Sequence, residues 1–378
     1  MRILLLSAYD AQSHQAWHQG LVRALPSHQW QVESLPARFF AWRFRGNALA
    51  WSASFQDASF DLILATSMTD LATLRGLCPS LATCPAILYF HENQFAYPLE
   101  QTNPRDLLHF QITQLYSALS ADRLIFNSQY NQDSFLQGVR QLLEKMPDAV
   151  PEQAKDILAT RSAILPVPLA KEAFPSHQSP QGPLQLLWNH RWEFDKAPER
   201  FFAALSLLKK QGIPFEVHVV GQRFRSQPPC FEQAKAAFGA EIRTWGYLPK
   251  KADYRSLLRQ CDLVISTALH EFQGLAVLEA CAAGCLPIVP NRLAYPQFFD
   301  DTWCYASFEK DEKAEAQALA KKIAFMASDM TALRALPRLD LTSLSWDVLA
   351  PKYQESFEDV VRMGRISIWG GPPCPPMG

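Results

Sequence analysis

Residues 268–290 read ALHEFQGLAVLEACAAGCLPIVP, and this stretch decides the fold class. The apolar run CDLVIST at 261–267 precedes it and predicts a buried parallel strand. After a short loop, apolar and small residues recur at the spacing of one helix face: Leu275, Leu278, Ala282 and Cys285. Gly284 and Pro287 mark the end of this helix, and residues 288–290 begin the next strand. This order of elements predicts an open α/β sheet.

The loop between that strand and helix has the features of an anion-binding site. Gly274 stands where the helix begins, and the first amides of a helix direct unpaired N–H groups toward a ligand. Glu271 lies in the loop, and Glu279 lies about one turn inside the helix. We therefore expect a bound phosphate here, beside a group that is rich in hydroxyls.

The N-terminal half alternates strands with helices, which predicts a parallel sheet with functional loops at the carboxyl ends of its strands. The expected strands lie at 2–7, 31–35, 62–65, 86–90 and 122–127, and the expected helices at 14–25, 105–120 and 129–137. Polar residues follow several of these strands, at 9–14, 66–70, 91–94 and 127–129. These loops are the places to seek a substrate.

The second half repeats the alternation. Strands are expected from residue 184 and at 215–221, 241–246, 261–267 and 303–305, with helices that begin near Pro198 and at 313–327. The sequence thus predicts an α/β protein of two Rossmann-like, doubly wound domains, with a cleft between them as the ligand site. We place the first domain at 1–170, completed by a helix at 345–363, and the second at 182–340; residues 364–378 form a disordered tail.

Composition narrows the class of protein. The chain has 378 residues, 48% of them hydrophobic, and a net charge of −1, which shows no overall bias toward nucleic acid or membrane. Its eight cysteines have neither metal-ligand spacing nor a paired pattern, so we expect reduced thiols and no metal site. The opening MRILLLSAYD is too short in its apolar run for a signal peptide, and no stretch predicts a membrane span. We expect a cytoplasmic protein without stable membrane insertion.

Two cations follow the first strand of the second half. Arg191 and Lys196 lie in HRWEFDK, directly after that strand, and such a pair suits a diphosphate. Alone they would equally fit a solvated surface, but the helix that begins at Gly274 belongs to the same sheet edge. Together these groups would stabilise a departing diphosphate without a metal.

The two glutamates allow two interpretations. Glu271 and Glu279 would act as a glycosidase pair if they flanked one bond as acid and base. Alternatively, Glu271 accepts hydrogen bonds from sugar hydroxyls and Glu279 from a ribose diol. Acidic charge near a helix start also needs no ligand at all, since it is favourable there by itself.

These motifs carry a resemblance to a known family. The region of Glu271 and Glu279 resembles the E-x7-E signature of the family-4 retaining glycosyltransferases, which have the GT-B fold, and HRWEFDKAPERFFAAL resembles their diphosphate clamp. The resemblance implies a nucleotide-sugar site made of Arg191, Lys196, Tyr247, Leu248, Glu271, Gly274, Leu275, Ala276 and Glu279. In it, Arg191 and Lys196 bind the diphosphate, Glu271 the sugar and Glu279 the ribose. Phe272 and Gln273 depart from the usual glycine after the first glutamate.

The N-terminal half narrows the resemblance. SAYDAQSHQAWHQGL, YFHENQFAYP and WNHRWEFDKAPE are similar to the tRNA-queuosine mannosyltransferase group. Its members transfer mannose from GDP-mannose to queuosine in a tRNA anticodon. The resemblance puts His91 near the donor sugar and Ser13 and His14 near the acceptor, to which we add Asn93 from the His91 loop. It implies four catalytic residues: His91, Glu271, Arg191 and Lys196.

The segment ARFFAWRFRGNALAW at 37–51 interleaves arginines with aromatic residues. Arg38, Arg43 and Arg45 would reach RNA phosphates while exposed rings stack on loop bases. The same pattern would fit a helix that packs its rings inward, or a membrane-surface segment of an enzyme with a lipid acceptor.

The expected chemistry needs no dedicated protein base, because a β-phosphate oxygen takes the proton of the acceptor hydroxyl. Three rivals remain at this point. One is a family-4 enzyme that uses another nucleotide sugar and a lipid or polysaccharide acceptor. The others are a non-catalytic RNA-binding module on the same scaffold and a sugar-nucleotide epimerase.

Overall fold

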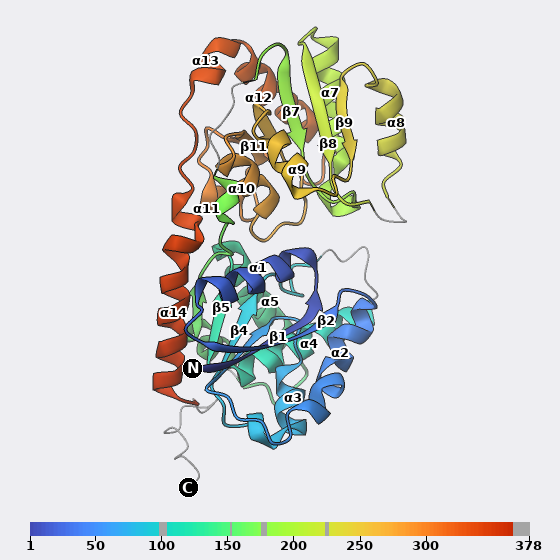
Figure 1. The fold of residues 1–378 in the computed structure, drawn as a ribbon. Helices are drawn as coiled ribbons and strands as arrows, with labels where there is room; N and C mark the ends of the chain where they lie inside the picture. The colour runs from blue at the N-terminus through green and yellow to red at the C-terminus, as the bar shows by residue number, and fades with distance from the viewer. Residues whose placement is uncertain (98–103, 152, 175–179, 224–226, 366–378) are drawn as a thin grey trace. The chain divides into compact units, whose positions relative to one another are not determined.

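The computed structural model describes residues 1–97, 104–151, 153–174, 180–223 and 227–365 (Figure 1). The chain divides into two compact units. Unit 1 comprises Met1–Pro168 and Trp346–Gly378, and unit 2 comprises Leu169–Ser345. Each unit holds a six-stranded sheet in which all pairings are parallel. The predicted α/β class with two Rossmann-like halves is confirmed.

The sheet of unit 1 has the strand order β2-β1-β3-β4-β5-β6. Its strands are β1 (Arg2–Asp10), β2 (Gln29–Pro36), β3 (Leu62–Thr66), β4 (Ala86–Phe90), β5 (Arg123–Phe126) and β6 (Ser162–Ile164). Every residue of β3 and β4 is buried, because helices cover both faces of such a sheet. The order makes β1 and β3 neighbours, so their carboxyl-terminal loops lie side by side.

The helices of unit 1 follow the strands in alternation. They are α1 (Gln12–Ala24), α2 (Phe40–Trp51), α3 (Leu71–Leu77), α4 (Pro104–Ser120), α5 (Gln129–Leu143), α6 (Ala154–Thr160) and α14 (Trp346–Met363). Ser128 caps α5 as its sequence position predicts, because its side chain accepts a hydrogen bond from Asn131 N. The cap fixes where the chain turns from β5 into α5.

The last helix belongs to the first unit. The predicted apolar face of α14 is buried through Leu349, Tyr353, Phe357 and Val360. The Tyr353 hydroxyl accepts a hydrogen bond from Trp17 Nε1 at 3.1 Å and lies 3.0 Å from the Tyr89 hydroxyl. Figure 1 shows α14 running along unit 1. Residues 336 positions apart are therefore joined in one core.

The sheet of unit 2 has the order β12-β11-β10-β7-β8-β9. Its strands are β7 (Leu184–Trp188), β8 (Phe215–Val220), β9 (Ile242–Gly246), β10 (Leu263–Ile265), β11 (Leu286–Pro290) and β12 (Cys304–Tyr305). Its helices are α7 (Pro198–Lys210), α8 (Cys230–Ala237), α9 (Lys251–Leu258), α10 (Leu275–Ala282), α11 (Tyr295–Phe298), α12 (Glu312–Ala327) and α13 (Met330–Ala335). Because β7 and β10 are neighbours, the loops that follow them meet at one sheet edge.

Several boundaries differ from the sequence prediction. The helix α10 ends at Ala282, so Cys285 lies beyond it, because Gly284 takes a left-handed φ of 108°. Of the predicted disordered tail, residues 366–378 lie outside the described residues. Arg365 is described, and its guanidinium contacts Asp122 at 3.0 Å.

Candidate active site

Lys196 is a buried cation of unit 2. It ends the short 3-10 helix Phe194–Lys196 that follows β7, and Pro198 then begins α7. Its ammonium lies 3.2 Å from Asp195 Oδ2 and 3.3 Å from Glu271 Oε2. It also donates a hydrogen bond of 2.6 Å to the carbonyl of His270. The ammonium therefore ties the β7 loop to the β10 loop.

The electrostatics of this cluster keep all three groups charged. Burial by itself would raise the pKa of the Glu271 carboxyl, but Lys196 and His190 lower it to about 2. Burial would lower the pKa of Lys196, yet Asp195 and Glu271 raise it above its ordinary value. An ionised Glu271 offers acceptors to sugar hydroxyls, and a charged Lys196 attracts a phosphate.

Gly274 starts α10 beside this cluster. It serves as the N-cap residue with φ 79°, a left-handed conformation that glycine adopts readily. A Cβ at this position would lie 2.9 Å from Tyr295 Cε1, so the ring of Tyr295 leaves room for glycine only. The first amides of the helix, at Leu275 and Ala276, are those that helix geometry leaves without an intrahelical acceptor. This arrangement suits a phosphate or a sugar oxygen.

Arg191 lies at the surface, in contrast to Lys196. Its side chain is 55% exposed, and its guanidinium lies 3.1 Å from Glu193 Oε2. Of the two cations predicted to bind a diphosphate, Lys196 is thus buried and Arg191 lies at the surface. Of the other predicted donor residues, Tyr247 is 50% exposed and Leu248 is half-buried, both just after β9.

Glu279 is half-buried on α10. Burial raises the pKa of its carboxyl to about 7, and Arg255 and Lys251 only partly offset this. Nearby, Asn189 donates hydrogen bonds to the Tyr254 hydroxyl at 2.9 Å and to the Ala276 carbonyl at 2.8 Å. Asn189 thereby holds the end of β7 against the first turn of α10.

Sequence reasoning missed a buried network behind the central loop. Glu315 is fully buried and receives two hydrogen bonds of 2.7 Å from Arg292, with Arg200 2.8 Å away. Arg292 also donates to the carbonyls of Thr267 and Ala268. This network fixes the loop that leads to Glu271. No local motif marks these residues, because their pairing depends on the fold.

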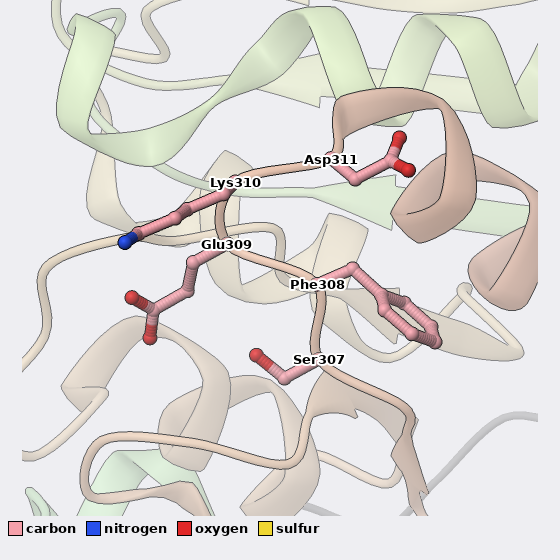
Figure 2. Close-up of a pocket in the computed structure, with 5 residues that line it drawn as sticks. All are labelled: Ser307, Phe308, Glu309, Lys310 and Asp311. Atoms are coloured by element: carbon pink, nitrogen blue, oxygen red, sulfur yellow. The ribbon is translucent and has the colours of Figure 1, made fainter.

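The same network holds the loop from β12 to α12. Arg200 donates to the Glu309 carbonyl at 2.7 Å, and the Phe308 amide donates to Glu315 at 2.9 Å. Figure 2 shows Glu309 and Lys310 extending to one side of this loop and Phe308 and Asp311 to the other. The loop lines a pocket of about 390 Å³ that contains none of the predicted donor residues.

In unit 1, His91 and His14 stack at the carboxyl ends of β4 and β1. Their ring centroids are 4.2 Å apart, and Trp17 packs edge-on against His91 at 4.7 Å. The His91 side chain is buried, and its Nε2 has no hydrogen-bond partner among the described residues. Burial, together with His14 and His18, holds the pKa of His91 well below its ordinary value. The imidazole is therefore neutral, and none of the described residues forms a hydrogen bond with its Nε2.

His14 is held in place on both sides of its ring. Its Nδ1 lies 2.8 Å from the Tyr9 carbonyl, and its Nε2 lies 3.8 Å from Glu92 Oε2. The neighbouring Asp10 accepts hydrogen bonds from Ser7 at 2.8 Å and from His18 at 3.2 Å. Sequence reasoning did not identify this Asp10–His18 pair.

The remaining predicted acceptor residues differ in their surroundings. Ser13 is exposed at the start of α1. Asn93 is fully buried: its amide donates to Asn131 Oδ1 at 2.9 Å, and its carbonyl oxygen accepts from the amide of Phe95. Asn93 thus shapes the loop after His91 and is not exposed to a ligand. Arg38 and Arg45 are exposed, whereas Arg43 is half-buried.

The described part of the chain has neither a cluster of metal-binding side chains nor a helix suited to span a membrane. No group of three or more histidine, cysteine, aspartate or glutamate side chains is placed there to hold a metal ion. No helix in the same residues has the length and apolar character that crossing a bilayer requires.

Two family models match consecutive parts of this chain. The family model described as tRNA-queuosine alpha-mannosyltransferase N-terminal matches residues 2–169, and the model described as glycosyl transferases group 1 matches residues 170–336. The structure is similar to sucrose-phosphate synthase from Thermosynechococcus elongatus, with a TM-score of 0.70, 13% identity and coverage of 96% of this chain and 100% of that chain.

Two curated relatives are similar in sequence. The tRNA-queuosine alpha-mannosyltransferase of Drosophila melanogaster is 34% identical over 308 residues, which cover 79% of this chain and 81% of the relative. GDP-mannose:cellobiosyl-diphosphopolyprenol alpha-mannosyltransferase of Xanthomonas oryzae is 19% identical over 183 residues, or 48% of each chain.

Two parallel six-stranded sheets and a group 1 transferase domain define a glycosyltransferase of the GT-B fold. The predicted fold class is confirmed. By its N-terminal match and by its identity to the Drosophila protein, the chain belongs to the tRNA-queuosine alpha-mannosyltransferase family.

Proposed function

We propose that this protein transfers a mannosyl group from GDP-mannose to the queuosine nucleoside of a tRNA anticodon, with retention at the anomeric carbon, in the cytoplasm. Family membership supports the reaction and the acceptor. The name of the Xanthomonas relative supports the donor. The observation that carries the chemistry is the partly buried ion pair of Lys196 and Glu271, 3.3 Å apart beside the start of α10.

In the proposed reaction, the bond between the anomeric carbon and the diphosphate breaks, and a bond to an acceptor hydroxyl forms on the same face. The proton of that hydroxyl goes to a β-phosphate oxygen of the leaving group. Lys196 and the amides of Leu275 and Ala276 stabilise the negative charge that develops on the diphosphate. Arg191, which is more than half exposed, neutralises the diphosphate from the solvent side.

Glu271 and His91 have positioning roles in this proposal. The carboxylate of Glu271 is ionised and accepts hydrogen bonds from the mannose hydroxyls. His91 is neutral, so its Nε2 binds a sugar hydroxyl without adding a competing positive charge. Glu279 accepts from the ribose, and Tyr247 with Leu248 borders the base. Ser13 and His14 contact the acceptor nucleoside.

A transfer assay tests the proposal. The purified chain is incubated with GDP-mannose and tRNA that carries queuosine, and the digested nucleosides are weighed by mass spectrometry. We expect one hexose added to queuosine and none on tRNA that lacks queuosine. UDP-glucose serves as the control donor. A chain that turns over GDP-mannose but leaves queuosine unmodified would contradict the acceptor and leave the transferase class intact.

A second candidate acceptor is a lipid-linked sugar, which the Xanthomonas relative's name favours. In that case the chain would mannosylate a polyprenyl-diphosphate glycoside and ignore tRNA. The two candidates are compared directly by offering both acceptors in one assay. Exclusive labelling of the lipid fraction would replace the first candidate with the second.

A further inference from the structure

Helix α2 presents aromatic and cationic side chains to solvent. Phe39 is 70% exposed and Trp42 is 58% exposed. Arg38 and Arg45 are exposed beside them. We name these four residues the α2 surface. Exposing large aromatic rings to water is unfavourable. Where such rings lie together on a surface and do not contribute to the core, they indicate a binding site.

The rings of Phe39 and Trp42 do not contribute to the core of unit 1, because other residues hold α2 against it. Phe44, Ala48 and Trp51 are buried in the hydrophobic core of unit 1. The segment therefore has two faces: one face packs inward, and the face with Phe39 and Trp42 remains outside. The outer face is available to a partner.

Gly46 is placed to hold the indole of Trp42 flat. It lies in the middle of α2, where glycine costs about 1 kcal/mol relative to alanine. A Cβ at Gly46 would lie 2.8 Å from the Trp42 ring, so the indole lies over the bare backbone of this residue. The helix thus gives up some stability and presents an exposed, flat ring held against its surface.

The charge of the segment has one sign. Residues 34–56 contain three arginines, no lysine and no aspartate or glutamate, in a chain whose net charge is −1. The guanidinium of Arg38 lies 5.7 Å from the centre of the Phe39 ring. Planar guanidinium groups pair with phosphates and stack with bases, whereas lysines act only as point charges. Exposed aromatic rings beside arginines therefore suit a flexible, negatively charged ligand whose planar rings can stack, such as a single-stranded nucleic acid.

The α2 surface is connected to the predicted acceptor loop. Phe40 packs edge-on against Tyr9 with ring centroids 5.6 Å apart. The carbonyl of Tyr9 in turn lies 2.8 Å from His14 Nδ1. Phe40 follows Phe39 of the α2 surface directly in the chain, so the residue next to this surface packs against Tyr9 at the end of β1.

From these observations we propose that the α2 surface binds unpaired loop nucleotides of the RNA acceptor. Bases stack on Trp42 and Phe39, and Arg38 and Arg45 contact the adjacent phosphates. The proposal rests on the proposed function for the identity of the RNA, and it deepens that function by naming a surface that selects a tRNA loop over a free nucleoside. Its recognition is largely independent of base identity, because every base has a face on which a ring stacks.

The test compares three proteins: wild type, Trp42→Ala, and a double variant that carries both Arg38→Ala and Arg45→Ala. For each, tRNA binding and mannosyl transfer to tRNA are measured. We expect the KM for queuosine tRNA to rise about tenfold in Trp42→Ala, the range of losing one base stack. The double arginine variant is expected to flatten the salt dependence of binding, by about 0.7 in log–log slope for each phosphate that is no longer neutralised. The KM for GDP-mannose, measured in parallel, is the internal reference.

Gly46→Ala separates recognition from stability. Alanine favours the helix, so the protein is expected to unfold at the same or a higher temperature, while the displaced indole weakens tRNA binding. Matched controls are Phe325→Ala on α12, whose ring is 73% exposed, and Arg140→Ala on α5, which pairs with Glu144. Both controls are expected to keep the wild-type KM for tRNA.

Direct tRNA binding by fluorescence anisotropy distinguishes this proposal from the proposed function. If wild type transfers mannose to tRNA and all α2 variants bind tRNA as well as wild type does, the proposed role of the α2 surface is wrong and the proposed function is retained. If no tRNA is modified but tRNA binding still depends on Trp42, the proposed role of the α2 surface is retained and the proposed function is wrong. Binding to phosphatidylglycerol vesicles that depends on Trp42, with tRNA binding unchanged, would assign the surface to a membrane and overturn the proposal.

Discussion

Lys196 Nζ lies 3.3 Å from Glu271 Oε2, although 75 positions separate the two residues. Adjacent strands bring them together: Lys196 follows β7, Glu271 follows β10, and β7 pairs with β10. Asp195 is the third member, 3.2 Å from the same ammonium. One cation between two carboxylates leaves this part of the site with a net negative charge. In the proposed reaction, an incoming diphosphate would therefore need Arg191 and the start of α10 as well as Lys196.

Replacing Glu271 by glutamine tests its role on the sugar. Gln keeps the volume of the side chain but removes the charge that pairs with Lys196. We expect mannosyl transfer to fall by roughly 10²–10³-fold, the usual effect of losing one preorganised group at a reacting centre. Transfer is measured under saturating substrates, with thermal unfolding as the check on folding. Glu144→Gln, which changes an exposed glutamate directly after α5, is the matched control; equal activity in both variants would exclude the assigned role.

Glu279 predicts a pH dependence of stability. Burial raises the pKa of its carboxyl from 4.5 to about 7 in the folded protein. Between these values the unfolded chain has already released the proton while the folded chain retains it, so stability falls as pH rises from 4.5 to 7 and then levels off. Glu279→Gln lacks this contribution. We expect the variant to gain on the order of 1–3 kcal/mol over wild type between pH 5 and pH 8.

Urea unfolding of wild type and Glu279→Gln at the two pH values measures this difference. The comparison between the two proteins cancels the titration of all other groups. Unfolding free energies that run parallel with pH would show that the folded-state pKa of Glu279 is ordinary.

The glycine at the start of α10 is tested by a pair of substitutions. Gly274→Ala and Gly212→Ala both place a Cβ on a residue of left-handed φ, 79° and 71°. Each is expected to cost about 1–2 kcal/mol for that conformation alone. Gly212 has no described atom within 4 Å of the new Cβ, whereas Gly274 meets Tyr295 at 2.9 Å. We therefore expect only Gly274→Ala to raise the KM for GDP-mannose as well.

Isothermal titration calorimetry with GDP compares the binding affinities of Gly274→Ala, Gly212→Ala and wild type without relying on catalysis. Weaker GDP binding in Gly274→Ala, with Gly212→Ala like wild type, would support a diphosphate at the start of α10. Unchanged binding in both would place the diphosphate elsewhere.

The buried hydroxyl of Tyr353 joins α14 to the rest of unit 1. Removing it in Tyr353→Phe leaves the Trp17 indole N–H without its acceptor. We expect a loss of about 1–3 kcal/mol in the free energy of unfolding, the cost of one unsatisfied buried donor. Tyr116→Phe, on the exposed side of α4, is the control and is expected to lose little. Denaturant unfolding followed by tryptophan fluorescence measures both.

Much of the fold could be predicted because its strands are buried on both faces. Such strands are short continuous apolar runs, and β4 begins and ends at the predicted residues, Ala86 and Phe90. Short helices on the periphery, such as α6 and α8, were not predicted, since they lack a long apolar face. The segment 37–51 was recognised by composition, but only the fold decides which of its rings are buried.

The site could be predicted where chemistry is local in sequence. Lys196, Glu271 and Gly274 stand next to strand ends, and the structure brings them together. Arg191 was predicted to act beside Lys196 because both follow a strand and resemble a diphosphate clamp, and neither observation shows that Arg191 lies at the surface with Glu193. The pairing of Arg292 with Glu315 could not be predicted from the sequence, because the chain contains many other arginines and glutamates that could form such an ion pair.

The position of α14 has a consequence for synthesis on the ribosome. Unit 1 begins at Met1 but needs Trp346–Met363 to cover Tyr89 and Trp17, and the whole of unit 2 is translated in between. Nascent unit 1 must therefore wait, with an uncovered apolar surface, until the whole of unit 2 and then α14 have emerged. A chaperone that binds nascent chains would find this surface, and a ribosome that stalls before residue 346 would release a product that cannot complete its first domain.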